Sequence, residues 1–321
     1  MKRVYLDQWV WIALSRAFHG QSTQPQEQEV LTLAQSAVGL GLVSFPLSFF
    51  HYSETYTARD PERGRRLAEV MAGLSKYHTI APENMLLPPE VDEALYRRFG
   101  RPVDRRKQDV FGVGVAHAFG EPGAVPPETW RNHVQGAEAV ALWEFYSLAG
   151  PQPDIPGSDS IEMESFKKPA SDFGRAQERF AKESKKLAYG RDKRKDALAA
   201  QELMDLVEAA LRQAMARAGI PEGALLAGGK EALTKFIEDV PTRNVAFRLR
   251  HFRHSMPQKK WTRTDLADIG ALAVAVPYCD AVVTEAVWVD GLRRARLDEK
   301  YDTTLMRSMR ELRSFLANVT L

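Results

Sequence analysis

The chain has 321 residues, of which 44% are hydrophobic and 27% are charged, as expected for a folded globular protein with a sizeable core. Its formal net charge is only +2, so a nucleic-acid-binding surface would have to come from a local cluster of basic residues. The single cysteine, Cys279, excludes an intrachain disulfide framework and a multi-cysteine zinc site. No apolar segment is long enough to span a bilayer and no signal-peptide pattern follows Lys2 and Arg3, so we expect a cytoplasmic protein.

The first part of the chain alternates predicted strands and helices. Residues 2–6 form a β-branched and aromatic run that predicts a buried strand, and Asp7 follows where the N-cap of a helix through Phe18 would stand. Asp60 and Pro61 are a typical start signal for a later helix. The other elements predicted here are a helix over 26–40, a strand over 42–45 and helices over 49–56 and 61–75.

The middle of the chain predicts mostly helices and carries no motif of a known family. Helices are expected over 86–99, 134–148 and 173–218, whereas the composition of residues 150–172 predicts a loop or linker. Alternation returns at the end of the chain, with a helix over 266–276, a strand over 281–284, and helices over 287–297 and 303–318.

Strands that alternate with helices at both ends of the chain predict an α/β fold with a parallel sheet. Ligands of such sheets bind beyond the carboxyl ends of the strands. Asp7 and Glu285 each come just after a predicted strand, so we expect the two ends of the chain to contribute to one site.

Acidic residues carry the clearest chemical signal. Asp265, Asp268, Asp280 and Glu285 surround one predicted helix and one predicted strand. Asp265, like Asp7, is also explained as a helix N-cap. Asp268 is harder to explain structurally, because an unpaired carboxylate one turn inside an apolar helix is costly. Carboxylates that converge without basic partners repel one another, and a bound Mg²⁺ or Mn²⁺ ion would relieve that repulsion.

Taken in order, these acids resemble the pattern of the PIN-domain (PIN-like) nuclease family. Such domains open with a strand that ends in an acid, matched here by Asp7. They carry a second acid on the helix after the second strand, matched by Glu54, although spacing alone explains Glu54 equally well as a solvated helix residue. The third and fourth acids flank a late helix and strand and are matched by Asp268 and Glu285.

The fourth acid departs from the family pattern. The family often has an aspartate one residue further along, where this chain has Ala286. Glu285 is the expected substitute, and Asp280 and Asp290 are its rivals. The resemblance therefore implies Asp7, Glu54, Asp268 and Glu285 as catalytic residues, with Asp7, Asp268, Glu285 and Asp280 as candidate metal ligands.

The resemblance also implies a domain organisation. It covers residues 1–80 and 240–321, which would form a parallel sheet flanked by helices on both faces. Residues 81–239 would form a large, mostly helical insertion that shapes substrate access or oligomerisation.

A basic segment precedes Asp265 and is the expected nucleic-acid contact. Residues 240–264 are rich in basic side chains interleaved with aromatic rings, which suits phosphate binding and base stacking, although a solvated helix surface is the plain alternative. Arg63, Arg65 and Arg66 could extend this nucleic-acid contact and are weaker candidates. The basic residues of the main segment are Arg243, Arg248, Arg250, Arg253, Lys259, Lys260 and Arg263.

The function implied by the resemblance is metal-dependent endoribonucleolytic cleavage of RNA. Two alternatives stay open: a DNA-directed or structure-specific nuclease on the same scaffold, and a non-catalytic nucleic-acid-binding scaffold protein. RNA is the expected partner, with single-stranded DNA as a second candidate, and no membrane is expected. Homo-oligomerisation and a regulatory partner such as an antitoxin are left open.

Overall fold

The computed structural model describes residues 1–56, 60–100, 109–121, 126, 136–150, 164–187, 189–206, 210–256, 258 and 260–320. At 164–174, 222, 226 and 263 it describes the backbone alone.

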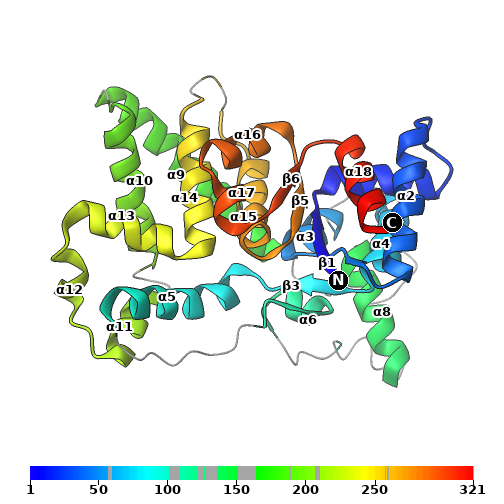
Figure 1. Cartoon of the computed structure of the whole chain (residues 1–321), viewed down its shortest axis with the longest axis horizontal. Helices are drawn as coiled ribbons and strands as arrows, with labels where there is room; N and C mark the ends of the chain where they lie inside the picture. Colours follow the sequence, from blue (N-terminus) through cyan, green and yellow to red (C-terminus); the bar gives the residue numbers. More distant parts are fainter. Residues whose placement is uncertain are drawn as a thin grey trace.

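A four-stranded parallel sheet lies at the centre of the fold (Figure 1). Its strand order is β2-β1-β5-β6, and each neighbouring pair is parallel. Leu6 pairs with Val283, and Val283 in turn pairs with Met306, so the carboxyl ends of three strands meet at one edge. The bounds are β1 (Lys2–Leu6), β2 (Val43–Ser44), β5 (Ala281–Val283) and β6 (Thr304–Met306).

Alternate residues of the strands enter two different hydrophobic cores, as the pleat requires. Val4 and Leu6 belong to a first core with helices on one face of the sheet, whereas Tyr5 belongs to a second core on the other face. The first core is built with α1 (Gln8–Phe18), α2 (Pro25–Gly39), α4 (Pro61–Ser75), α8 (Gly136–Ala149) and α18 (Met309–Thr320).

The second core lies under the helices that follow the insertion. It gathers apolar side chains of α14 (Pro241–His254), α15 (Arg263–Tyr278), α16 (Ala286–Arg294) and α17 (Leu297–Tyr301). α3 (Phe49–Tyr56) lies at the junction, because Tyr52 enters the first core and Phe50 packs against the second.

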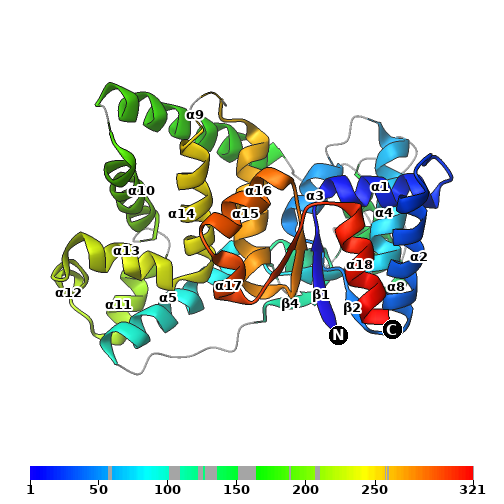
Figure 2. The same ribbon diagram turned by 45° about the horizontal axis from the view of Figure 1, so that its top comes forward.

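A third core forms a helical lobe on the far side of α14 (Figures 1 and 2). Phe247 of α14 belongs to this core, whereas Val245 and Leu249 of the same helix belong to the second. α9 (Glu164–Lys186) packs against α15 at the top of Figure 2. The other lobe helices are α5 (Glu83–Phe99), α10 (Arg191–Leu206), α11 (Arg212–Ala218), α12 (Glu222–Leu226) and α13 (Gly229–Asp239).

A small antiparallel sheet of β3 (His78–Ile80) and β4 (Phe111–Val113), followed by α6 (Val115–Ala118), lies beside the main sheet. Leu47 connects the two, because its N–H donates to the His78 carbonyl and its carbonyl accepts from the Ile80 N–H.

The predicted α/β class and parallel sheet flanked by helices are confirmed. Contacts cross both predicted domain boundaries, since α8 packs against α3 and α4 and α14 joins two cores. Three details were wrong: β6 replaces the start of the predicted final helix, β3 and β4 were not foreseen, and α9 begins at Glu164 inside the predicted loop. None of the helices among the described residues is long and apolar enough to cross a membrane.

Candidate metal centre

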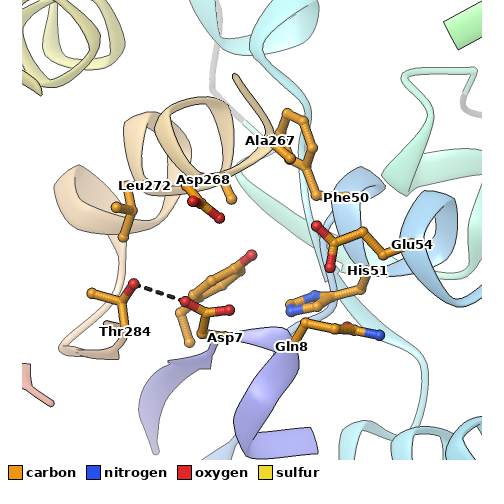
Figure 3. A pocket seen from close by; sticks show the side chains of 11 residues that line it. Asp7, Gln8, Phe50, His51, Glu54, Ala267, Asp268, Leu272 and Thr284 are labelled. Atoms are coloured by element: carbon orange, nitrogen blue, oxygen red, sulfur yellow. Dashed lines mark hydrogen bonds between the residues drawn. The ribbon is translucent and has the colours of Figure 1, made fainter. Parts of the chain in front are cut away.

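The four acidic residues implied by the resemblance come from four segments and line one recess at the carboxyl edge of the sheet. Asp7 directly follows β1, and Glu285 comes two residues after β5. Glu54 projects from α3 and Asp268 from α15, and the carboxylates of Asp7, Glu54 and Asp268 turn toward a common space (Figure 3).

The recess has an inner and an outer part. Asp7, Glu54 and Asp268 line the inner part, whose free volume of about 20 Å³ is enough for about one water molecule or ion. The same three residues and Glu285 line the outer part, together with the ion pair of Arg253 and Asp265, and its free volume is about 310 Å³. Trp9 and Trp288 form part of its walls. A small ion could therefore sit inside while a larger group approaches from outside.

Asp7 is held by the neighbouring strand more than by its own helix. It occupies the N-cap position of α1 but closes no capping hydrogen bond with its side chain. Its backbone N–H donates to the Val283 carbonyl at 3.0 Å, and its Oδ2 accepts from the Thr284 hydroxyl at 2.8 Å. Burial raises the pKa of Asp7, and the charge of Glu285 raises it further, whereas the bond from Thr284 opposes the change.

Asp268 and Glu54 are carboxyl groups that resist ionisation. Burial, followed by the charge of Asp7, raises the pKa of Asp268 to about 7, against the hydrogen bond that the Trp288 indole N–H donates to Oδ2 at 3.0 Å. Burial, then the charges of Asp7 and Asp268, raises the pKa of Glu54 to about 7. Three carboxylates that oppose one another's ionisation make a region where a cation would be stabilised.

The donor set fits a hard divalent cation. Oxygen ligands from carboxylates suit Mg²⁺ or Mn²⁺, and Mg²⁺ is usually held by one or two carboxylates, with waters and substrate phosphates completing its shell. Across the described part of the chain, no group of three or more His, Cys, Asp or Glu side chains is placed so that together they could hold a metal ion. Asp7 and Asp268 are therefore the candidates for direct contact, and Glu54 and Glu285 complete the wall.

Asp280 lies at the other edge of the sheet and is not a candidate metal ligand. It precedes β5, where its Oδ1 is 2.8 Å from the Lys2 ammonium and its Oδ2 accepts from the Arg3 backbone N–H at 2.8 Å. Burial alone would raise the pKa of Asp280, but these two partners outweigh it and lower the pKa. The expectation that Asp280 is a metal ligand is corrected, because Asp280 lies at the amino end of β5 and the recess lies at the carboxyl end. Asp290 is exposed on α16 and lines neither part.

Asp265 does take part in capping α15, but the N-cap is Thr262 and Asp265 stands at the third helical position. Its backbone N–H donates to the Thr262 hydroxyl and its carboxylate accepts from the Thr262 N–H, which is a complete capping box. Arg253 Nε also donates to Oδ1 at 2.8 Å. Burial would raise the pKa of Asp265, but Arg253 and Thr262 outweigh it and the pKa is lowered.

The four arginines of α14 are held in ion pairs, and two of them, Arg250 and Arg253, are buried. Arg250 is 3% exposed and contacts Glu202, which is itself fully buried. Arg243 pairs with Glu83 and also with Glu202. The prediction that Arg243 and Arg250 contact nucleic acid is therefore wrong. Their acidic partners lie on helices far away in the sequence, and residues 240–264 themselves contain no acid that would have indicated such pairs before Asp265.

The remaining basic residues divide into paired and exposed ones. Arg248 is 2.7 Å from Glu238, and Arg253 is buried against Asp265, so neither presents a free charge. Lys260 is exposed, as expected for a phosphate contact. Lys259 and the side chain of Arg263 lie outside the described residues.

The weaker basic extension on α4 is also largely neutralised. Arg65 lies 3.0 Å from Glu62 and 2.9 Å from Glu69, and Arg66 lies 2.9 Å from Glu62. Arg63 is exposed on the same helix.

Sequence reasoning missed several polar residues of the recess, among them Gln8, Thr284 and Trp288. Thr284 and Trp288 hold Asp7 and Asp268 by hydrogen bonds, and Gln8 lines both parts of the recess. Thr284 carried a weak signal, because a polar residue directly after a buried strand lies at the ligand-binding edge. Trp288 carried none, because its partner comes from a different helix.

Together, the fold and the recess define an α/β protein with carboxylates gathered at the carboxyl edge of a parallel sheet. When the chain is compared with protein-family models, with curated proteins and with solved structures, none matches it.

Proposed function

We propose that the protein is a divalent-metal-dependent nuclease of the PIN-like class that hydrolyses phosphodiester bonds in RNA. The observation that carries the proposal is the convergence of Asp7, Glu54, Asp268 and Glu285 on one recess at the carboxyl edge of the sheet. The raised pKa values of Asp7, Glu54 and Asp268 support a cation-binding role, because buried carboxylates that face one another are costly without one.

The residues of the recess would divide the work between binding and orientation. Asp7 and Asp268 would bind the ion, with their carboxylates held in place by Thr284 and Trp288. Glu54 and Glu285 would bind it as well or accept hydrogen bonds from water near the scissile phosphate. When bound, Mg²⁺ or Mn²⁺ would neutralise the phosphate, favour deprotonation of a water and stabilise the leaving oxygen.

The choice of RNA comes from the family resemblance, and DNA is the second candidate on the same chemistry. The pairing of the four arginines of α14 with acidic residues removes the main sequence argument for an extended phosphate track. A non-catalytic scaffold is less well supported, because it gives no reason to keep four acidic side chains in one recess.

The proposal is tested by incubating the pure protein with labelled single-stranded RNA, single-stranded DNA and duplex, with Mn²⁺ or with EDTA. We expect cleavage of single-stranded RNA that needs Mn²⁺ and falls at least about 100-fold in Asp7→Asn and Asp268→Asn, as when one charge-stabilising group leaves an active site. Asp280→Asn is the matched control and should keep the wild-type rate.

Cleavage that persists in EDTA, or in both Asp7→Asn and Asp268→Asn, would contradict the metal mechanism. Faster cleavage of DNA would favour the second candidate. Binding of nucleic acid without cleavage under every metal condition would favour the scaffold.

A further inference from the structure

A second cavity lies beside the recess, and Phe50 lines both. Its free volume is about 250 Å³, and the rings of Phe49, Phe50 and Phe119 form part of its wall. Phe49 contacts both of the other rings edge-to-face, with centroids 5.3 Å from Phe50 and 5.0 Å from Phe119. The wall of the cavity is therefore partly aromatic.

Phe50 is shared by this cavity and by the inner part of the recess. Figure 3 shows it on α3 above Glu54 and close to Ala267 of α15. Gly270 of α15 makes room for the ring, since a Cβ at that position would lie 2.4 Å from Phe50 Cζ. A glycine inside a helix costs about 1 kcal/mol relative to alanine, and the close approach of Phe50 gives it a structural reason.

The second cavity is close enough to the acids to be reached by the same strand of nucleic acid. Phe50 and Glu54 are one turn apart on α3, about 6 Å between Cβ atoms. Val274, on the cavity wall, is six positions beyond Asp268 on α15, about 9 Å along the axis. These spans correspond to two or three stacked nucleotide steps of about 3.4 Å.

A polar group stands at the edge of this aromatic cavity. Asn84, in the first turn of α5, is exposed, lines the cavity, and makes no side-chain hydrogen bond to any part of the chain that the structure describes. Its carboxamide has both donors and an acceptor to offer. Glu83, the other polar group of that turn, is tied to Arg243.

We propose that this cavity binds a nucleobase of a single-stranded substrate, which the aromatic rings would contact and whose edge Asn84 would bind. Aromatic rings plus an amide are the means by which proteins hold an unstacked base, and a purely apolar ligand would leave Asn84 without a role. The inference rests on the proposed nuclease function, because the metal ion held by the acids would bind the phosphate while the cavity holds a base a few nucleotides away.

The test leaves the protein unchanged and alters the substrate. A labelled single-stranded RNA with one preferred cleavage position is prepared as a series in which a single abasic site is moved along the strand. Binding is measured by fluorescence anisotropy in Ca²⁺, and cleavage is measured in Mn²⁺. We expect one abasic position, within about three nucleotides of the cleaved bond, to weaken binding about tenfold, and the others to leave it unchanged.

Protein variants then test whether the base at the sensitive position is bound in the cavity. Asn84→Ala should weaken binding of the intact strand and leave binding of the sensitive abasic strand unchanged. Asn318→Ala, an exposed asparagine on α18, is the matched control and should behave as wild type.

Equal affinity for every strand of the series, or an Asn84→Ala effect that is the same with and without the base, would overturn the subsite. Metal-dependent cleavage in that case would leave the nuclease proposal standing. Absence of cleavage would overturn the nuclease proposal, and the binding series would still decide whether the cavity takes a base.

Discussion

At the residue scale, Asp268 and Glu54 bind protons more tightly in the folded chain than in the unfolded chain. Between about pH 4 and pH 7, unfolding therefore releases protons from both side chains. Their pKa values of about 7 lie above the ordinary values of 3.8 and 4.5. The main cause for both is burial, and the charges of neighbouring acids add to it. A metal ion in the recess would compete with those protons, so stability, pH and metal binding are linked.

Without metal, the free energy of unfolding is expected to fall as the pH rises from about 4 to about 7, because over that range the folded chain binds more protons than the unfolded chain. Mn²⁺ should reverse the loss, with a larger rise of the melting temperature at pH 8 than at pH 5.5. Metal at 100 times its Kd contributes about 2.7 kcal/mol. Thermal denaturation at both pH values, with and without Mn²⁺, measures this.

Asp268→Asn provides the control, since it removes one of the two groups. It should flatten the pH dependence and reduce the stabilisation by Mn²⁺. Equal stabilisation of the two proteins by Mn²⁺ would show that the ion binds elsewhere.

Thr284 is expected to orient Asp7 for metal binding. Thr284→Val removes the hydroxyl that donates to Asp7 Oδ2 while keeping the shape of the side chain. The affinity for Mn²⁺ should fall about 10- to 100-fold, the usual effect of losing a group that orients a ligand. Titration calorimetry measures it, and Thr284→Ser should retain most of the affinity. Equal affinities of the valine and serine variants would assign Thr284 a packing role alone.

The sequence pointed to Asp7 and Glu285 because each follows a strand, and to Asp268 because it interrupts an apolar helix pattern, whereas Glu54 was selected only through the family resemblance. It was not sufficient to place Asp280, which also adjoins a strand but at its amino end. The donors Thr284 and Trp288 reach their acids across separate segments, and no local pattern reports such a pair.

At the element scale, α14 and α15 are joined by a buried ion pair. Arg253 near the end of α14 contacts Asp265 in the first turn of α15, and Asp265 also closes the capping box with Thr262. Arg253 is 4% exposed, so removing its partner would leave a buried charge unpaired.

Asp265→Ala should therefore lower the free energy of unfolding by about 3–5 kcal/mol, the cost of breaking a buried pair. Asp280→Ala breaks an exposed pair with Lys2 and should cost at most about 1 kcal/mol. Urea denaturation of the two variants compares them directly. Similar losses would mean that the Arg253 pair contributes no more than an exposed one.

The sequence of α14 explains why the basic residues at 243–253 were expected to contact nucleic acid. The residues of α14 alternate arginine with apolar and aromatic side chains, a pattern that fits a nucleic-acid contact equally well as a helix buried between two cores. Only the partners decide, and Glu83 and Glu202 are more than forty positions away from Arg243 and Arg250. The short strand β6 was missed because three residues before a helix give too little periodicity.

At the scale of the whole molecule, α14 couples the helical lobe to the sheet. Phe247 is fully buried in the lobe core, and Val245 and Leu249 are fully buried in the core on the sheet. A helix that contributes to two cores ties their unfolding together.

Phe247→Ala should destabilise the protein by about 3–5 kcal/mol, the usual cost of removing a buried phenylalanine ring. Trp11 and Trp288 report on the two sheet cores, and far-UV circular dichroism reports on helices throughout. The unfolding midpoints measured by tryptophan fluorescence and by circular dichroism should fall by the same amount. Met204→Ala, at a side chain 66% exposed on α10, is the matched control and should change stability by less than about 0.5 kcal/mol. Separate shifts would show that the lobe unfolds independently.

The overall architecture was predictable only where the chain alternates between strand and helix. The parallel sheet followed from such alternation at residues 2–6 and 281–284, whereas the helical lobe is held by contacts between helices far apart in sequence. Helical periodicity predicts the helices of 173–218 but not which core receives them.

The most direct test of the central claim is to locate the ion. Crystals soaked in Mn²⁺ and measured near the manganese absorption edge should show an anomalous peak in the recess, about 2.0–2.3 Å from oxygens of Asp7 and Asp268, a range that spans the usual distances of small hard cations to oxygen. A peak beside Asp280, or an empty recess at a Mn²⁺ concentration that supports cleavage, would contradict the account.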